Sequence, residues 1–372
     1  MRIAIVANTS WNILNFRLGL IRHFISLGHE VFVVAPIDDT SKTLSENCEA
    51  RIIPIQHLLR KGKNPLKDIR LMRELRHIYK KNQIDVAFQF TIKPNVYGSL
   101  AARTLPTKTV SNVTGLGYVF LNKSPVNLLV QRLFKYALSH SDKVVFQNSQ
   151  DLDEVVALGI VADSKSLIID GSGINVDVFA PRVSEANTHE HFIFLFIGRL
   201  LHDKGVIELV EAFNMLCVDY KHVELRMIGA LDIGNPSAIS ETLLKQWLYR
   251  NQQIRYLGLS NDLPSIINDV DCVVLPSYRE GLPKSILEAM SMSKPIIVSD
   301  APGCRQLVDN GRNGIICEAK SAIALYKAMR EMVQLPQGIR SEMGTHGRHL
   351  AVNKYNEKII VAKYEALLNT MM

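Results

Sequence analysis

Cysteine is scarce in this sequence of 372 residues, and its apolar runs are short. The five cysteines are odd in number and form no C-x-x-C pair, so neither a disulfide framework nor a zinc site is predicted. No apolar run reaches the ~20 residues that a membrane-spanning helix needs. The opening M-R-I-A-I-V-A is too short for a secretory signal. A protein of the reducing cytoplasm is expected, meeting any membrane only at its surface.

Acidic residues are fewer than basic ones, 36 against 43, which gives a formal net charge of +7 and a pI near 9.1. This excess favours an anionic partner, such as a nucleotide, a diphosphate lipid or a membrane surface. Nucleic acid is not predicted, because no aromatic interleaving or recognised binding motif accompanies the charge.

The basic residues are densest between Arg60 and Lys81, where a helix is predicted from about residue 65 to 81. Its apolar stripe is expected to hold Ile69, Met72, Leu75 and Tyr79. A cationic amphipathic helix is attracted to an anionic membrane by roughly 1 kcal/mol per nearby Lys or Arg. A core-packed helix with a merely solvated charged face explains the same pattern, and both interpretations stay open.

Short apolar strands alternate with helical stretches along the chain, which predicts parallel, doubly wound sheets of α/β class. A polar stretch without apolar period, residues 172–191, interrupts this series. It predicts a boundary between a first domain, 1–180, and a second domain, 190–350. A last amphipathic helix is expected at about 355–372.

Two stretches of the second domain combine charge with glycine. Residues 192–205 read F-I-F-L-F-I-G-R-L-L-H-D-K-G, a buried strand running into a loop with two cations. Residues 279–288 read R-E-G-L-P-K-S-I-L-E, which places Glu280 in a strand-to-helix loop and Glu288 on the helix. Helix N-termini bind anions, and open α/β sheets bind ligands at the carboxyl ends of their strands. Such a site suits a sugar nucleotide, because amides and cations bind its phosphates and carboxylates accept hydrogen bonds from its hydroxyls.

These two stretches, followed by G-C-R-Q-L-V-D-N-G-R-N-G, resemble the nucleotide-sugar half of the retaining glycosyltransferases of family 4. The resemblance covers essentially the whole chain. It implies the GT-B fold, in which two Rossmann-like domains face a central crevice and a C-terminal helix crosses back to the first domain. The first half looks like bacterial enzymes that extend lipid-linked oligosaccharides in surface polysaccharide and glycan biosynthesis.

The resemblance implies roles for residues of the second domain. Arg199 and Lys204 would grip the donor diphosphate, Glu280 would lie at the transferred sugar, and Glu288 would bind the ribose. The remaining donor-binding candidates are Gly198, Gly229, Gly281, Leu282, Pro283 and Lys284. For Lys284, a side chain that simply points to water stays an open alternative. The donor is expected to be a UDP-sugar, with uracil assigned on family frequency alone. No metal ligand set and no cofactor is expected, because fixed cations can neutralise the diphosphate.

The first domain is expected to face the acceptor, a glycan on polyprenyl diphosphate. The loop of residues 8–17 lacks the glycine pair of many relatives, but it carries Asn15 and Arg17 at the mouth of a helix predicted over 16–27. Later loops follow the strands predicted at 86–90 and 109–113. The acceptor-side candidates there are Lys93, Asn95, Asn112, Thr114 and Tyr118. No general base is named.

The expected function is retaining transfer of an N-acetylhexosamine or hexose, by an enzyme peripheral on the inner face of the cell membrane. One alternative is a nucleotide-sugar epimerase or hydrolase of similar fold, and another is a transferase with a soluble acceptor. A non-catalytic carbohydrate-binding protein is a third possibility.

Overall fold

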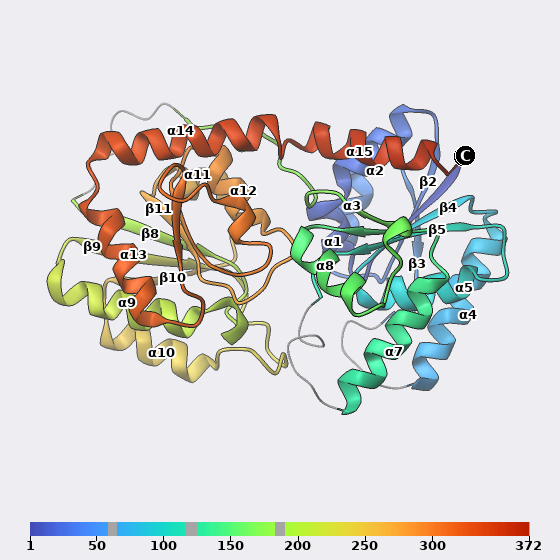
Figure 1. Ribbon diagram of the computed structural model, residues 1–372, viewed down its shortest axis with the longest axis horizontal. Coiled ribbons are helices and arrows are strands. Elements are labelled where there is room, and N and C mark those ends of the chain that lie inside the picture. The colour runs from blue at the N-terminus through green and yellow to red at the C-terminus, as the bar shows by residue number, and fades with distance from the viewer. Residues whose placement is uncertain (59–64, 117–124, 183–189, 372) are drawn as a thin grey trace. The chain divides into compact units, whose positions relative to one another are not determined.

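The computed structural model describes residues 1–58, 65–116, 125–182 and 190–371. The chain folds into two compact units. The first comprises Met1–Ser172 together with Lys358–Met372, and the second is Gly173–Glu357. Each unit is an α/β sandwich built on one parallel sheet (Figure 1). The last helix of the chain, α15 (Glu357–Asn369), packs into the core of the first unit.

The sheet of the first unit has seven parallel strands in the order β3-β2-β1-β4-β5-β6-β7. The strands are β1 (Arg2–Val6), β2 (Glu30–Ala35), β3 (Arg51–Pro54), β4 (Val86–Phe90), β5 (Lys108–Val113), β6 (Lys143–Phe146) and β7 (Ser166–Ile168). β4 is buried along its whole length, and β1 is buried except at Arg2, because helices cover both faces of the sheet. Strand order reverses between β1 and β4, the position at which such sheets bind ligands.

Helices of the first unit connect these strands. They are α1 (Ser10–Phe16), α2 (Leu18–Ser26), α3 (Ser41–Asn47), α4 (Pro65–Lys81), the π-helical turn η1 (Pro94–Gly98), α5 (Ser99–Ala102), α7 (Pro125–Ser139) and α8 (Ser149–Ala157). One face of the sheet packs on α2 and α15, where the Phe88 ring lies 5.4 Å from Phe24 and 5.9 Å from Tyr364 between centroids. The other face packs on α4 through Leu71, Leu75 and Tyr79.

The second unit has six parallel strands in the order β10-β9-β8-β11-β12-β13. They are β8 (Phe192–Ile197), β9 (Val223–Ile228), β10 (Ile254–Gly258), β11 (Cys272–Leu275), β12 (Ile296–Ser299) and β13 (Gly314–Cys317). The helices are α9 (Val206–Asp219), α10 (Glu241–Arg250), α11 (Leu263–Asn268), α12 (Lys284–Ser291), α13 (Ala322–Gln334) and α14 (Gln337–Asn353). Figure 1 shows α9, α10 and α13 on one side of this sheet and α11, α12 and α14 on the other. Strand order reverses between β8 and β11.

Two local predictions for the first unit are wrong. The stretch expected to be a loop before a helix over 16–27 is instead a pair of helices, α1 and α2, which meet at Arg17. The Thr9 side chain accepts a hydrogen bond from the Asn12 amide and starts α1 earlier than apolar spacing suggested. On α4, Leu71, Leu75, Ile78 and Tyr79 are buried, whereas Ile69 of the predicted stripe is 43% exposed.

All five cysteines are free. Among the described residues, no helix is both long and apolar enough to cross a bilayer.

Candidate active site

Two loops at the carboxyl ends of β8 and β11 build the candidate site of the second unit. Gly205, at the start of α9, has a φ of 70°, and a Cβ added there would lie 2.1 Å from the Pro276 carbonyl oxygen. Only glycine therefore allows the loop after β8 to approach the loop after β11 this closely. The Tyr278 amide adds a hydrogen bond of 2.9 Å to the Asp203 carbonyl. The two sequence motifs are thus fastened together through backbone atoms.

Arg199 follows β8, and a carboxylate holds its side chain in place. Its guanidinium Nη1 lies 2.8 Å from Oδ2 of Asp232, whose side chain is only 5% exposed, while the Arg199 side chain is 45% exposed. Asp232 also accepts a hydrogen bond of 2.9 Å from the Asn235 amide. The cation is therefore oriented at the surface. Asp232 was not predicted, because nothing in the surrounding A-L-D-I-G-N-P marks it as the partner of a residue 33 positions away.

Lys204 and Glu280, the other two predicted catalytic residues, are brought together. Their side chains form an ion pair, and both are largely buried, with 18% and 14% of the side chain exposed. Glu280 is further fixed by its backbone amide, which donates to the Pro302 carbonyl at 2.9 Å. A phosphate oxygen approaching Lys204 would share the ammonium group with this carboxylate, since a Lys ammonium has three donors.

Glycines allow the surrounding loops to approach this region. Gly229 has a φ of 145°, and a Cβ there would lie 1.8 Å from the carbonyl oxygen of Gly198. Gly303, in the loop after β12, has a φ of 79°, and a Cβ would lie 2.3 Å from the Glu280 carbonyl oxygen and 2.5 Å from that of Gly281. The sequence signal at Gly229 was weak, because any short loop favours glycine. The structure gives the specific reason, a close approach of backbone to backbone.

Helix α12 begins directly after the Gly281-Leu282-Pro283 turn, with Pro283 at its N-cap position. Glu288 lies on this helix and is 6% exposed. Burial raises the pKa of Glu288 to about 7, while the nearby Lys284 ammonium opposes that rise. Lys284 Nζ stands 4.0 Å from Glu288 Oε1, so these two predicted donor-binding residues face each other. A carboxylate held this way accepts hydrogen bonds from hydroxyl groups with little competition from water.

The acceptor-side candidates of the first unit fall into two groups. Some have their polar atoms engaged within the fold: the Asn15 amide donates to the Trp11 carbonyl at 2.9 Å, and Lys93 Nζ lies 2.9 Å from Oδ1 of Asp68 on α4. Asn112 is 2% exposed, and its side chain bonds to the Gln89 carbonyl and to the Tyr364 hydroxyl. Thr114 is half-buried just after β5. Tyr118 lies outside the described residues.

Arg17 and Asn95 form the second group, because each is buried with a polar atom that has no partner in the described part of the chain. Arg17 is 3% exposed, its Nε makes no hydrogen bond, and its Cζ stands 3.9 Å from the centre of the Phe90 ring. Burial lowers the pKa of Arg17 to about 10, opposed by the Tyr364 side chain, so the guanidinium stays charged at neutral pH. Asn95 donates to the Asn112 carbonyl at 2.8 Å, but its Oδ1 has no partner.

Comparison with known proteins assigns the family. The family model described as Glycosyl transferases group 1 matches residues 180–350, and the one described as Glycosyl transferase 4-like matches residues 2–148. The chain is a glycosyltransferase, and each of its two halves matches a glycosyltransferase family model. The first match includes Arg199, Lys204, Glu280 and Glu288, and the second includes Arg17.

Relatives of this glycosyltransferase align with it over most of its length. One, from Campylobacter jejuni, is N,N'-diacetylbacillosaminyl-diphospho-undecaprenol alpha-1,3-N-acetylgalactosaminyltransferase, 27% identical over 100% of this chain and 99% of its own. Another, from Escherichia coli, is UDP-Gal:alpha-D-GlcNAc-diphosphoundecaprenol alpha-1,3-galactosyltransferase, 24% identical over 78% of this chain and 76% of its own.

Solved structures share the fold of the glycosyltransferase. The Anabaena protein HepE, crystallised with UDP, superposes with a TM-score of 0.80 at 18% identity over 100% of both chains. Sucrose-phosphate synthase from Thermosynechococcus elongatus superposes with a TM-score of 0.84, also at 18% identity, over 100% of this chain and 99% of that one. With its two parallel-sheet units, the glycosyltransferase has the GT-B fold, as expected from the motifs.

Proposed function

We propose that this glycosyltransferase moves an N-acetylhexosamine or hexose from a UDP-sugar, with retention of configuration, onto a saccharide carried by polyprenyl diphosphate. The observation that carries the proposal is the set of charges after β8 and β11: Arg199 is held by Asp232, Lys204 is paired with Glu280, and Lys284 faces Glu288. The relatives named above support the lipid-linked acceptor, and the complex of HepE with UDP supports the uridine donor.

The chemistry of this proposal needs charge stabilisation at the leaving group. As the bond between the sugar C1 and the phosphate oxygen breaks, negative charge builds on UDP, and fixed cations stabilise it most in the transition state. Arg199 and Lys204 supply those cations, and Glu288 binds the ribose hydroxyls. The acceptor hydroxyl attacks C1 on the same face and gives its proton to the departing phosphate oxygen. Atoms and charge balance without an enzymic nucleophile.

Acceptor-dependent transfer is the direct test. The protein is incubated with UDP-, GDP- and dTDP-sugars, with and without a short-chain prenyl-diphosphate-linked N-acetylhexosamine. We expect a product one sugar longer, formed only with acceptor and fastest with a UDP-sugar. Hydrolysis or isomerisation of the nucleotide sugar at the same rate without acceptor would instead favour the epimerase or hydrolase.

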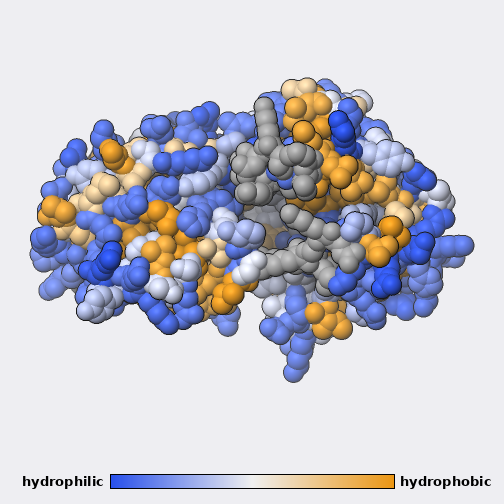
Figure 2. Space-filling view, turned by 90° about the horizontal axis from the view of Figure 1, so that it is seen from below, coloured by the Kyte–Doolittle hydropathy of each residue, from blue (hydrophilic) through white to orange (hydrophobic). Residues whose placement is uncertain are grey.

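The proposal also includes an anionic membrane surface as partner, because a lipid-linked acceptor stays in the bilayer. On α4 the cations Lys67, Arg70, Arg73, Arg76, Lys80 and Lys81 are exposed. On α7, Phe134, Ala137 and Leu138 are buried while the outer face exposes Leu128, Leu129, Leu133 and Tyr136 beside Arg132 and Lys135. The sequence of α7 contains no acidic residue. Figure 2 shows apolar surface alternating with hydrophilic surface on this side of the first unit.

Vesicle sedimentation tests this surface. Replacing Arg70, Arg73, Arg76 and Lys80 by Gln should weaken binding to anionic vesicles, and salt should release the wild type as the screening length falls from about 10 Å at 0.1 M to about 3 Å at 1 M. A matched control replaces four exposed cations of the second unit by Gln: Lys221, Lys245, Arg250 and Lys327. Equal loss in both variants would mean that net charge alone, and not this surface, drives binding.

A further inference from the structure

The arginine at the junction of α1 and α2 is buried without a counter-ion. Arg17 is 3% exposed, and within the described residues its guanidinium makes no ion pair and no hydrogen bond. The Arg17 Cζ lies 3.9 Å from the centre of the Phe90 ring, which is itself fully buried. Burying an unpaired charge costs free energy, so a buried charge in a protein normally has an oppositely charged or hydrogen-bonded partner, which a ligand can supply.

Other buried polar atoms without partners among the described residues follow β4, the strand that ends in Phe90. Thr91 comes directly after Phe90 and has a φ of 75°, a strained conformation for a β-branched residue. Its buried Oγ1 makes no hydrogen bond to any residue that the structure describes. The Thr91 carbonyl accepts a hydrogen bond of 3.1 Å from the backbone amide of Asn95. The side-chain Oδ1 of Asn95 is also buried and has no partner among the described residues. Within the described residues, Nε of Arg17, Oγ1 of Thr91 and Oδ1 of Asn95 thus lack hydrogen-bond partners. Such unsatisfied buried atoms are rare in folded proteins.

The position of this cluster in the topology points to a ligand. Arg17 follows β1 through α1, Thr91 follows β4, and β1 and β4 are neighbours at which the strand order of the first sheet reverses. In the second unit, Arg199 follows β8 and Glu280 follows β11, and the strand order of the second sheet reverses between these two strands. Open α/β sheets bind ligands outside the carboxyl ends of strands at this position.

We propose that Arg17, Thr91 and Asn95 form a binding site for a sugar diphosphate in the first unit. This inference rests on the proposed function, in which both substrates are sugar diphosphates. The Arg17 fork and the Thr91 hydroxyl donate to phosphoryl oxygens, a geometry that guanidinium groups match with two parallel hydrogen bonds. The Asn95 Oδ1 accepts from a hydroxyl of the adjoining sugar. The diphosphate belongs either to the lipid-linked acceptor or to the nucleotide donor.

The decisive variant is Arg17→Met, which keeps a long flexible side chain but removes the charge. If Arg17 serves a ligand, the unliganded variant should be as stable as the wild type or more so, because a buried unpaired charge has been removed. Affinity for the sugar diphosphate should fall on the order of 100-fold or more. Arg17→Lys keeps the charge without the planar guanidinium, so its affinity for the sugar diphosphate should lie between those of the wild type and Arg17→Met.

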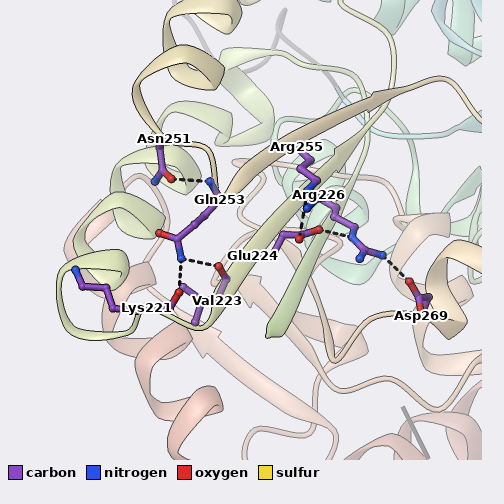
Figure 3. Close-up of polar contacts among 8 residues, drawn as sticks. All are labelled: Lys221, Val223, Glu224, Arg226, Asn251, Gln253, Arg255 and Asp269. Atoms are coloured by element: carbon purple, nitrogen blue, oxygen red, sulfur yellow. Dashed lines mark hydrogen bonds and ion pairs between the residues drawn. The ribbon is translucent and has the colours of Figure 1, made fainter. Parts of the chain in front are cut away.

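Arg226 in the second unit is the matched control (Figure 3). It is also largely buried, but its Nε lies 2.6 Å from Oε1 of Glu224 and its Nη1 2.7 Å from Oδ2 of Asp269. Arg226→Met leaves the buried Glu224 carboxylate short of a partner, so this variant should unfold at lower temperature and bind substrates like the wild type.

Two titrations assign the ligand. Calorimetry measures binding of UDP and of a short-chain prenyl-diphosphate-linked N-acetylhexosamine to the wild type, Arg17→Met and Arg226→Met. Weaker binding of the prenyl compound alone assigns the site to the acceptor, and weaker binding of UDP alone assigns it to the donor. Unchanged binding of both by Arg17→Met, whatever its melting temperature, overturns the site and leaves Arg17 a structural contact of Phe90. Failure of the proposed function is distinguishable, because then the wild type itself would not bind or extend the prenyl compound.

Discussion

The two units carry arginine at corresponding places in their sheets, yet they hold it in opposite ways. In the second unit, Arg199 is paired with Asp232 and Lys204 with Glu280, so each cation is oriented by a carboxylate. In the first unit, Arg17 is oriented by burial and by the Phe90 ring, and no carboxylate neutralises it within the described residues. A paired cation shares its donors with a ligand, whereas an unpaired one keeps all of them for it. The first arrangement favours stability, and the second favours affinity.

The largest expected effect comes from removing the paired cations. Arg199→Ala and Lys204→Ala should each lower kcat by roughly two to three orders of magnitude, about 3–4 kcal/mol, because each deletes a fixed donor at the leaving phosphate. Steady-state kinetics with saturating donor measures this. Arg255→Ala is the control, since Arg255 is 62% exposed and lies 3.3 Å from Glu224. Unchanged kcat in both site variants would mean that the diphosphate binds elsewhere.

A smaller effect should follow from adding a side chain where the loops after β8 and β9 are in close contact. Gly229→Ala places a Cβ against the Gly198 carbonyl, where backbone cannot move aside, and should cost about 2–4 kcal/mol of unfolding free energy and also weaken donor binding. Gly258→Ala is the control, because its φ is 68° but nothing lies within 4 Å of the added Cβ. Chemical denaturation of both separates backbone strain, about 1–2 kcal/mol, from the steric clash. Equal losses would contradict the close approach.

A pH-dependent effect is expected at Glu288. Its pKa in the folded protein is about 7 against an ordinary value of 4.5, so the folded state holds the proton more tightly between these values. Stability should therefore fall as pH rises through this window. Glu288→Gln removes the buried charge and should raise the unfolding free energy by about 1–3 kcal/mol at pH 8.

At pH 5 the variant and the wild type should unfold alike. Thermal unfolding at the two pH values, with Glu241→Gln as an exposed control, measures the difference. The same gain at both pH values would mean that burial of the carboxylate is not the cause.

Removal of divalent metal ions is expected to leave the rate of transfer unchanged. If Arg199 and Lys204 neutralise the diphosphate, transfer should continue at an unchanged rate in excess EDTA. Loss of activity on chelation, with full recovery on adding Mg²⁺ or Mn²⁺, would show that protein cations alone are not sufficient.

Sequence reasoning located the strands and the loops of the second unit well, because buried parallel strands are continuous apolar runs and the motifs are local. β4 has the predicted bounds, 86–90, and β8 is the buried strand predicted to run into the loop with two cations. It could not find Asp232 or the Tyr364–Asn112 hydrogen bond, since those pairs are distant in the chain and have no local signature. Ile69 was placed on the buried stripe because the helical period alone does not fix which way a helix faces. The partnerless state of Arg17 is visible only once every neighbour is in place.

Helix α15 has a consequence for how the protein is made. The Tyr364 hydroxyl bonds Asn112 at 2.8 Å, Lys363 pairs with Asp170, and Tyr364, Leu367 and Leu368 complete a core begun by β1. During translation the first unit lacks these contacts until the whole second unit has left the ribosome. Domains otherwise tend to fold in the order of synthesis. The half of the enzyme that is synthesised first is therefore completed last, and a nascent chain cut short before residue 358 would hold a finished second unit beside an unfinished first one.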